Sequence, residues 1–142
     1  MHGDYRLDNL VFHASEPRVI AVLDWELSTL GHPMADFAYH ALAWSSPTGA
    51  MRGLAGMDLA VLGIPSVEAY VERYCERVGM TQPNAAEWSF YVAYNLFRGA
   101  AISQGILKRA LDGSASSAHA FETGSRARAV AEAGWRHVAD LG

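Results

Sequence analysis

The sequence contains one cysteine, Cys75, and one lysine, Lys108. A single cysteine excludes a disulfide within the chain, and a reducing cytoplasm is the location we expect. The formal net charge is −4 and the ten arginines are scattered from Arg6 to Arg136, which argues against a nucleic-acid partner. No apolar run reaches the roughly 18 residues of a membrane span, so no membrane partner is expected.

The size and apolar content of the sequence indicate one folded domain, or one lobe of a larger enzyme. It has 142 residues, of which 51% are hydrophobic and 18% are charged. These fractions are typical of a chain that buries a core rather than of a disordered tail. The first residues lack the basic and apolar segments of a signal peptide, which agrees with the cytoplasmic expectation.

A β-hairpin is predicted near the start, followed by helices. Apolar runs at residues 10–12 and 19–23 flank a polar turn at Glu16-Pro17, as in a hairpin. Helical patterns cover residues 34–44, 66–78, 84–111 and 118–140, with a short helix at 58–62 and a loop at 46–56. Ser66 and Asn84 are expected N-caps, and Gly79 an expected helix end. The sequence therefore predicts a mainly α protein with a short β-hairpin, in the α+β class.

Three polar residues stand where phosphoryl transfer would need them. Asp4 is followed five residues later by Asn9, and Asp24 comes directly after the second apolar run. The predicted hairpin would bring Asp24 back beside the loop that carries Asp4 and Asn9. Transfer from ATP to a hydroxyl needs a carboxylate that accepts the proton and oxygen ligands for Mg²⁺. Taken singly, each of these residues could equally cap a turn or end a strand.

The motif His2-Gly3-Asp4 with Asn9, and the motif 22–26 (Val-Leu-Asp-Trp-Glu), resemble the aminoglycoside phosphotransferase and choline kinase family, which is related to protein kinases. Residues 2–39 are most similar to the phosphotransferase domain associated with acyl-CoA dehydrogenases. The resemblance implies the C-terminal lobe of a kinase-like fold, with ATP as co-substrate and Mg²⁺ as cofactor. It implies a small-molecule hydroxyl as acceptor, with a hydroxyacyl-CoA as one candidate.

The resemblance also implies a role for each matching residue. Asp4 matches the catalytic base, and Asn9 and Asp24 match the Mg²⁺ ligands. Glu26 matches a position near the metal, although a charge at a helix start is an equal interpretation. The remaining three have supporting roles: Arg6 a phosphate contact, His2 a structural role in the loop, and Asp36 an anchor for the loop backbone.

The nucleotide-binding lobe of a kinase has no counterpart in this sequence. No G-x-G-x-x-G occurs, and the only lysine, Lys108, falls in the helical region. We therefore expect a single lobe, with the loop, hairpin and strand end in residues 1–33 and a helical subdomain in residues 34–142. The N-terminal lobe is expected to be absent, so that ATP binding is weak and partners include that lobe or a second copy of the chain.

Two other functions fit the same residues. A lobe without its nucleotide-binding half could serve as a non-catalytic binding module. A metal-dependent phosphohydrolase could use Asp4, Asp24 and Glu26, although such enzymes commonly add His ligands, and no His here has suitable spacing. Residues 46–56 and the face formed by residues 91–98 are candidates for the acceptor site.

Overall fold

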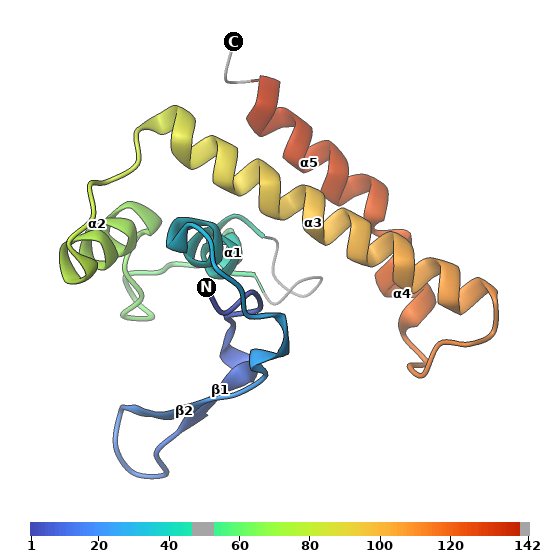
Figure 1. Cartoon of the computed structure of the whole chain (residues 1–142), viewed down its shortest axis with the longest axis horizontal. Coiled ribbons are helices and arrows are strands. Elements are labelled where there is room, and N and C mark those ends of the chain that lie inside the picture. Colours follow the sequence, from blue (N-terminus) through green and yellow to red (C-terminus); the bar gives the residue numbers. More distant parts are fainter. Residues whose placement is uncertain (47–52, 140–142) are drawn as a thin grey trace. The chain divides into compact units, whose positions relative to one another are not determined.

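The structure is a computed structural model that describes residues 1–46 and 53–139 (Figure 1). The chain divides into two compact units, Met1–Pro83 and Asn84–Gly142, and each is described by itself. Helices dominate, and the described part of the chain has one two-stranded antiparallel sheet. The predicted fold class is confirmed.

The first unit opens with the predicted hairpin. A 3-10 turn, η1 (Leu7–Asn9), leads into β1 (Leu10–Phe12), which pairs with β2 (Val19–Val22). Leu10 lies opposite Val22, and the register shifts by one residue before Phe12, which pairs with Val19. The β-branched residues of β2 favour an extended chain. A second 3-10 turn, η2 (Trp25–Leu27), follows the hairpin directly.

Two helices complete this unit, and the second has the caps that its sequence predicts. In α1 (Pro33–Ser45) proline occupies the first turn, where its missing N–H costs nothing. In α2 (Val67–Val78) the Ser66 side chain accepts a hydrogen bond from the Ala69 N–H at 3.2 Å. Gly79 ends α2 in the left-handed conformation, with φ of 68°.

Aromatic side chains join α1 to α2. Phe37 stacks on Tyr74 with ring centroids 4.2 Å apart, and Trp44 stacks on Tyr70 at 4.9 Å. The Trp44 indole N–H also donates to the Pro65 carbonyl oxygen at 2.8 Å. Such ring pairs add about 0.5–1.5 kcal/mol each beyond the area that they bury.

Cys75 lies in the core of the first unit, with 1% of its surface exposed. Burial raises the pKa of its thiol, which disfavours the reactive thiolate. We expect a disulfide-exchange reagent to label Cys75 only when this unit opens. Each 1.4 kcal/mol of opening free energy, approximately, slows the labelling tenfold. Rapid labelling of the folded chain, at the rate seen in denaturant, would contradict this packing.

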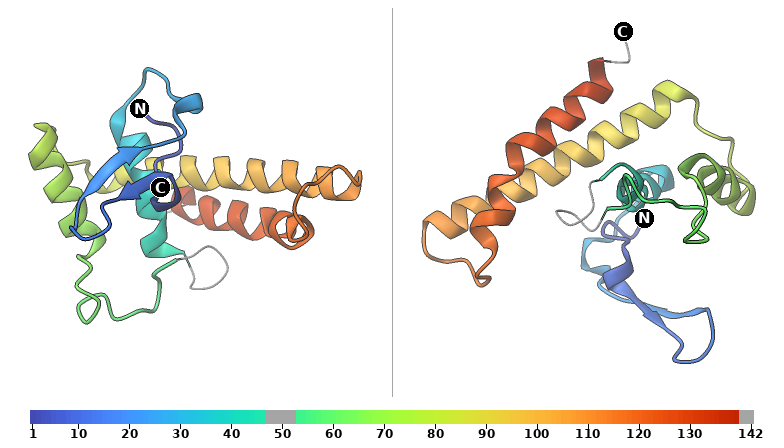
Figure 2. Two further views of the ribbon diagram at one scale, coloured as in Figure 1. Left: turned by 90° about the horizontal axis from the view of Figure 1, so that it is seen from below. Right: turned by 180° about the vertical axis from the view of Figure 1, so that it is seen from behind.

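The second unit is built on one long helix. Helix α3 (Ala85–Leu111) begins with a capping box, in which Asn84 and Glu87 each accept a hydrogen bond from the other's backbone N–H. Helices α4 (Ala120–Ser125) and α5 (Ala127–Ala139) both contact α3. Figure 2 shows α5 running alongside α3. None of the described helices combines the length and apolar character needed to cross a membrane.

Two predicted helices are wrong in detail. Residues 58–62 form turns rather than a helix, because Gly63 adopts a φ of 67° and Pro65 follows, leaving too few residues for a stable helix. The predicted final helix is divided at Arg126 into α4 and α5. Gly124 lies so close to α3 that an added Cβ would be 2.6 Å from the Leu107 Cα.

Candidate active site

The hairpin places the segment before Asp24 against the loop that carries Asn9. Because Leu10 pairs with Val22, the next residues outward are Asn9 and Leu23. The Leu23 N–H donates to the Asn9 carbonyl oxygen at 2.8 Å. Asp24, one residue further on, therefore lies beside the end of this loop. Residues fifteen positions apart in the sequence are thus brought together by two short strands.

Asp4 and Asn9 are joined directly. The Asn9 side-chain amide donates to the Asp4 carbonyl oxygen at 2.9 Å and to its carboxylate Oδ2 at 3.1 Å. Asn9 is buried, whereas the side chain of Asp4 keeps 18% of its surface exposed. Arg6 lies 3.4 Å from Asp4 Oδ2 through Nε, and half of its own side chain is exposed. One carboxylate oxygen of Asp4 is thus held by neighbours, and the group still reaches the surface.

His2 connects the loop to the end of β2. Its Nδ1 accepts a hydrogen bond from the Asp4 N–H at 3.2 Å, which requires Nδ1 to be unprotonated. Its Nε2 therefore carries the proton and donates to the Leu23 carbonyl oxygen at 2.8 Å. His2 is buried and both of its ring nitrogens are used. This arrangement suits a residue that fixes the loop better than a metal ligand or a general base.

Asp36, from the first turn of α1, holds the backbone at the start of the loop. Its Oδ1 accepts a hydrogen bond from the Gly3 N–H at 2.9 Å, and its Oδ2 accepts one from the His2 N–H. A carboxylate supplies two acceptors in a fixed geometry, so both neighbouring amides are satisfied at once. The distance of 33 residues between Gly3 and Asp36 makes this a tertiary contact.

Replacing Asp36 with Asn should destabilise the chain by roughly 1–3 kcal/mol, because Asn offers one oxygen where two amides need acceptors. Urea denaturation followed by circular dichroism measures this difference. Asp112→Asn is the matched control, because Asp112 is an exposed residue paired with Lys108 on α3, and this substitution should cost less than about 1 kcal/mol. Equal stability of Asp36→Asn and Asp112→Asn would contradict the anchoring role.

Asp24 has an unusual backbone conformation. Its φ of 66° and ψ of 52° lie in the left-handed region, and it is the one residue other than glycine with positive φ in the described part of the chain. For an ordinary L-residue this conformation costs roughly 1–2 kcal/mol, although Asp tolerates it better than most. The side chain is exposed, as is that of Glu26 in η2. Such outliers concentrate at functional sites.

Aromatic residues lie behind the loop. The Tyr5 ring meets His2 edge-on at 6.0 Å on one side and His40 of α1 at 5.6 Å on the other. His40 also contacts Tyr70 and Trp44. Burial lowers the pKa of the His40 imidazole, which favours its neutral form at pH 7. These rings support Tyr5, the residue that follows Asp4.

Asn9 and Asp24 carry side-chain oxygen atoms of the chemical type that Mg²⁺ prefers as ligands. The Asn9 amide nitrogen donates to Asp4, so the side-chain oxygen is the atom with which Asn9 would bind a cation. Asp24 would add a carboxylate. Mg²⁺ prefers oxygen ligands and is commonly held by one or two protein groups together with substrate phosphates. No group of three or more His, Cys, Asp or Glu residues suited to a metal occurs within residues 1–46 and 53–139. Asp4, Asp24 and Glu26 therefore do not form the carboxylate cluster of the phosphohydrolase alternative.

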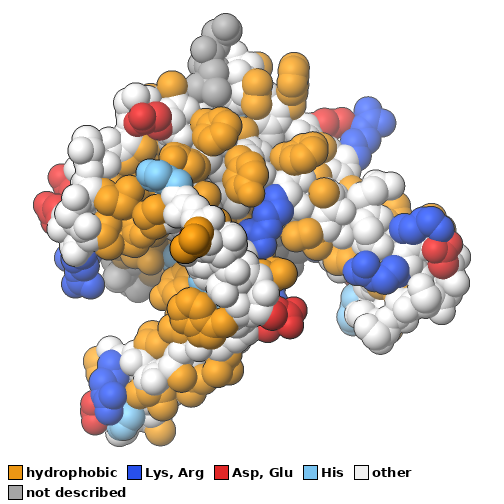
Figure 3. Space-filling view, in the orientation of Figure 1, with side chains coloured by type: hydrophobic (Ala, Val, Ile, Leu, Met, Phe, Trp, Pro, Cys, Tyr) orange, Lys and Arg blue, Asp and Glu red, His pale blue; other side chains and the backbone are white. Residues whose placement is uncertain are grey.

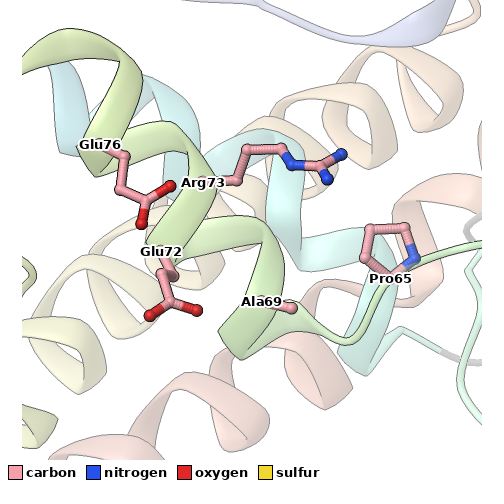
Figure 4. A pocket seen from close by; sticks show the side chains of 5 residues that line it. All are labelled: Pro65, Ala69, Glu72, Arg73 and Glu76. Atoms are coloured by element: carbon pink, nitrogen blue, oxygen red, sulfur yellow. The ribbon is translucent and has the colours of Figure 1, made fainter.

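The surface near the site is largely apolar. Hydrophobic side chains cover much of the hairpin region in the space-filling view (Figure 3). On the hairpin and η2 the exposed residues include Phe12, Ile20, Leu23, Trp25 and Leu27. A pocket lies on α2 instead, lined by Pro65, Ala69, Glu72, Arg73 and Glu76 (Figure 4). None of the predicted site residues lines this pocket.

Two residues that stand within the quoted motifs, Gly3 and Trp25, have structural roles that the sequence did not indicate. An added Cβ on Gly3 would overlap the Leu27 carbonyl oxygen, and Gly3 has a φ of 88°, so this position requires glycine. The Trp25 indole N–H donates to the Val22 carbonyl oxygen at 2.8 Å. The motif His2-Gly3-Asp4 includes this glycine but does not show why the position requires it. The Trp25 contact leaves no signal in the sequence.

Comparisons with known proteins point in one direction. A model of the phosphotransferase enzyme family matches residues 1–91. Acyl-CoA dehydrogenase family member 10 of Mus musculus is 50% identical over 95% of this chain, and family member 11 of Homo sapiens is 43% identical over 94%. A crystal structure of a Ralstonia eutropha protein assigned as an aminoglycoside phosphotransferase matches 98% of this chain, with 55% identity and a TM-score of 0.91.

The chain spans a minor part of these relatives. It covers 13% of the mouse protein, 17% of the human protein and 42% of the Ralstonia chain. The resemblance expected from the motifs is confirmed, and so is the kinase-like fold of the described helices and hairpin.

Proposed function

Because this chain belongs to the phosphotransferase enzyme family, we propose that it carries the catalytic and metal-binding residues of an ATP-dependent kinase for small-molecule hydroxyls. The observation that supports this proposal most is the joining of Asp4, Asn9 and the Asp24 segment by the hairpin and its hydrogen bonds. These residues supply a proton acceptor and two oxygen ligands, which are the parts that phosphoryl transfer requires.

In the proposed mechanism Asp4 orients the acceptor hydroxyl and takes its proton. The hydroxyl oxygen forms a bond to the γ-phosphorus of ATP, and the bond from that phosphorus to the β–γ bridging oxygen breaks. The proton passes to the Asp4 carboxylate. Asn9 and Arg6 hold one carboxylate oxygen of Asp4, which leaves the other to accept the proton. Arg6, half exposed beside Asp4, would contact a phosphate of the nucleotide.

Asn9 and Asp24 would hold Mg²⁺, with Glu26 nearby. The ion supplies charge neutralisation at the phosphate oxygens when it is bound. Asp36 and His2 would act indirectly, because they fix the backbone of the loop that carries Asp4.

We propose the hydroxyl of a hydroxyacyl-CoA as the acceptor. The support is the naming of the relatives: proteins 40–50% identical to this chain are called acyl-CoA dehydrogenases, a class of enzyme named for acyl-CoA. Of the two segments considered for the acceptor site, residues 47–52 of the first lie outside the described residues. The second, residues 91–98, belongs to α3.

An acceptor screen tests this function. The chain is incubated with Mg²⁺ and γ-labelled ATP together with a hydroxyacyl-CoA, the free hydroxy acid, an aminoglycoside or the matching acyl-CoA without a hydroxyl. Transfer of label to the hydroxyacyl-CoA but not to the acyl-CoA supports the proposal. Transfer to the aminoglycoside alone would replace the acceptor. Phosphate release from phosphoesters without ATP would favour the phosphohydrolase.

A further inference from the structure

The left-handed conformation of Asp24 needs support from its neighbours. The Asp24 side chain makes no capping hydrogen bond to η2, so the carboxylate does not hold its own backbone. A strand that continued in the extended conformation would carry this carboxylate in another direction. Something else must therefore keep the chain turned at this residue.

Two side chains hold the carbonyl groups that precede Asp24. The Trp25 indole N–H donates to the Val22 carbonyl oxygen at 2.8 Å. His2 Nε2 donates to the Leu23 carbonyl oxygen, also at 2.8 Å. The two donors support each other, because the rings of His2 and Trp25 pack with centroids 4.6 Å apart.

Burial alone does not explain Trp25. Its side chain leaves 55% of its surface exposed, so it adds little to the core of the unit. Its hydrogen bond closes a loop of four residues, from Val22 to Trp25, with Asp24 inside. That geometry constrains Asp24 directly, whereas a core residue would stabilise the whole unit.

We propose that Trp25 is a positioning residue that keeps Asp24 in its left-handed conformation and thereby sets the affinity of the site for a divalent cation. The second half of this inference rests on the proposed function, in which Asp24 is a metal ligand. The first half concerns the backbone alone and holds with or without metal. The two halves are measured separately.

The backbone is examined by NMR of the metal-free chain, and the metal by the electron paramagnetic resonance signal of free Mn²⁺ during titration. Mn²⁺ replaces Mg²⁺ because both prefer oxygen ligands. The variants are Trp25→Leu, which loses ring and donor, and Trp25→Phe, which keeps a ring against His2 without the donor. Trp135→Leu is the control, since Trp135 lies on α5 in the other unit and is 69% exposed.

Trp25→Leu is expected to change the Asp24 backbone resonances and to give couplings that no longer indicate a positive φ. It is also expected to weaken Mn²⁺ binding roughly 10-fold or more, as for other residues that orient metal ligands. Trp25→Phe should give an Mn²⁺ affinity between those of the wild type and Trp25→Leu. Trp135→Leu should match the wild type in both measurements. The melting temperatures of both leucine variants are compared, because a purely structural role would lower stability and leave Asp24 unchanged.

Unchanged Asp24 resonances in Trp25→Leu would overturn the inference, whatever the metal data show. Shifted resonances with no Mn²⁺ binding by the wild type would support the positioning role and contradict the proposed metal site. Shifted resonances with wild-type Mn²⁺ affinity in Trp25→Leu would overturn the link between the conformation of Asp24 and the metal.

Discussion

Replacing Asp4 with Asn is expected to lower kcat for phosphoryl transfer by roughly 100- to 10,000-fold, the range for loss of a general base. An amide cannot accept the hydroxyl proton. The fold should survive, because the oxygen of an Asn side chain can still accept the Asn9 amide hydrogen bond that Asp4 Oδ2 accepts now. The rate is measured with the acceptor found by the screen, at saturating ATP and Mg²⁺.

Asp8→Asn is the control for this prediction. Asp8 lies four residues further on in η1, is exposed, and sits 4.0 Å from Arg6. The same chemical change there should leave kcat nearly unchanged. If Asp4→Asn transferred phosphate as fast as Asp8→Asn does, Asp4 would not be the base.

Replacing Gly3 with Ala should destabilise the chain by about 3 kcal/mol or more. The left-handed backbone at φ of 88° costs an alanine roughly 1–2 kcal/mol. The new Cβ would also overlap the Leu27 carbonyl oxygen, and overpacking typically costs about 1–3 kcal/mol. The new Cβ is fixed to the backbone of residue 3, and the oxygen belongs to the backbone of Leu27. Neither atom can therefore move aside without shifting the loop that carries Asp4 or η2.

Gly56→Ala separates the two costs of this substitution. Gly56 has nearly the same φ, 83°, but among the described residues no heavy atom beyond its chain neighbours lies within 4 Å of its added Cβ. Its substitution should cost only the backbone strain, roughly 1–2 kcal/mol. Urea denaturation of both variants gives the difference. Equal losses for Gly3→Ala and Gly56→Ala would show that the loop does not press against Leu27.

Local sequence signals predicted most of the secondary structure. The apolar runs on either side of Glu16-Pro17 gave the hairpin, and Ser66 and Asn84 gave the starts of α2 and α3. The break at Arg126 was not predictable, because it accompanies the close approach of Gly124 to α3, a contact between segments distant in the sequence. Patterns of helix period carry no information on such contacts.

The site shows the same division. The spacing of Asp4, Asn9 and Asp24 could be read directly, because the hairpin between them is a local structure. The anchoring by Asp36 came from the family resemblance alone. The hydrogen bond from Trp25 to Val22 and the close approach of Gly3 to Leu27 depend on packing in three dimensions, and the sequence motifs do not predict these contacts.

We propose that Asp4, Asn9 and Asp24 form one metal–phosphate site. Paramagnetic broadening by Mn²⁺·ATP in NMR spectra of the labelled chain tests it directly and detects weak binding. Selective broadening of the resonances of these three residues is expected. Asp24→Asn should abolish the broadening, since Asn tolerates the left-handed backbone but lacks the charge. The control Asp112→Asn should retain it. Broadening that spares these residues, or that persists unchanged in Asp24→Asn, would show that the three residues do not form this site.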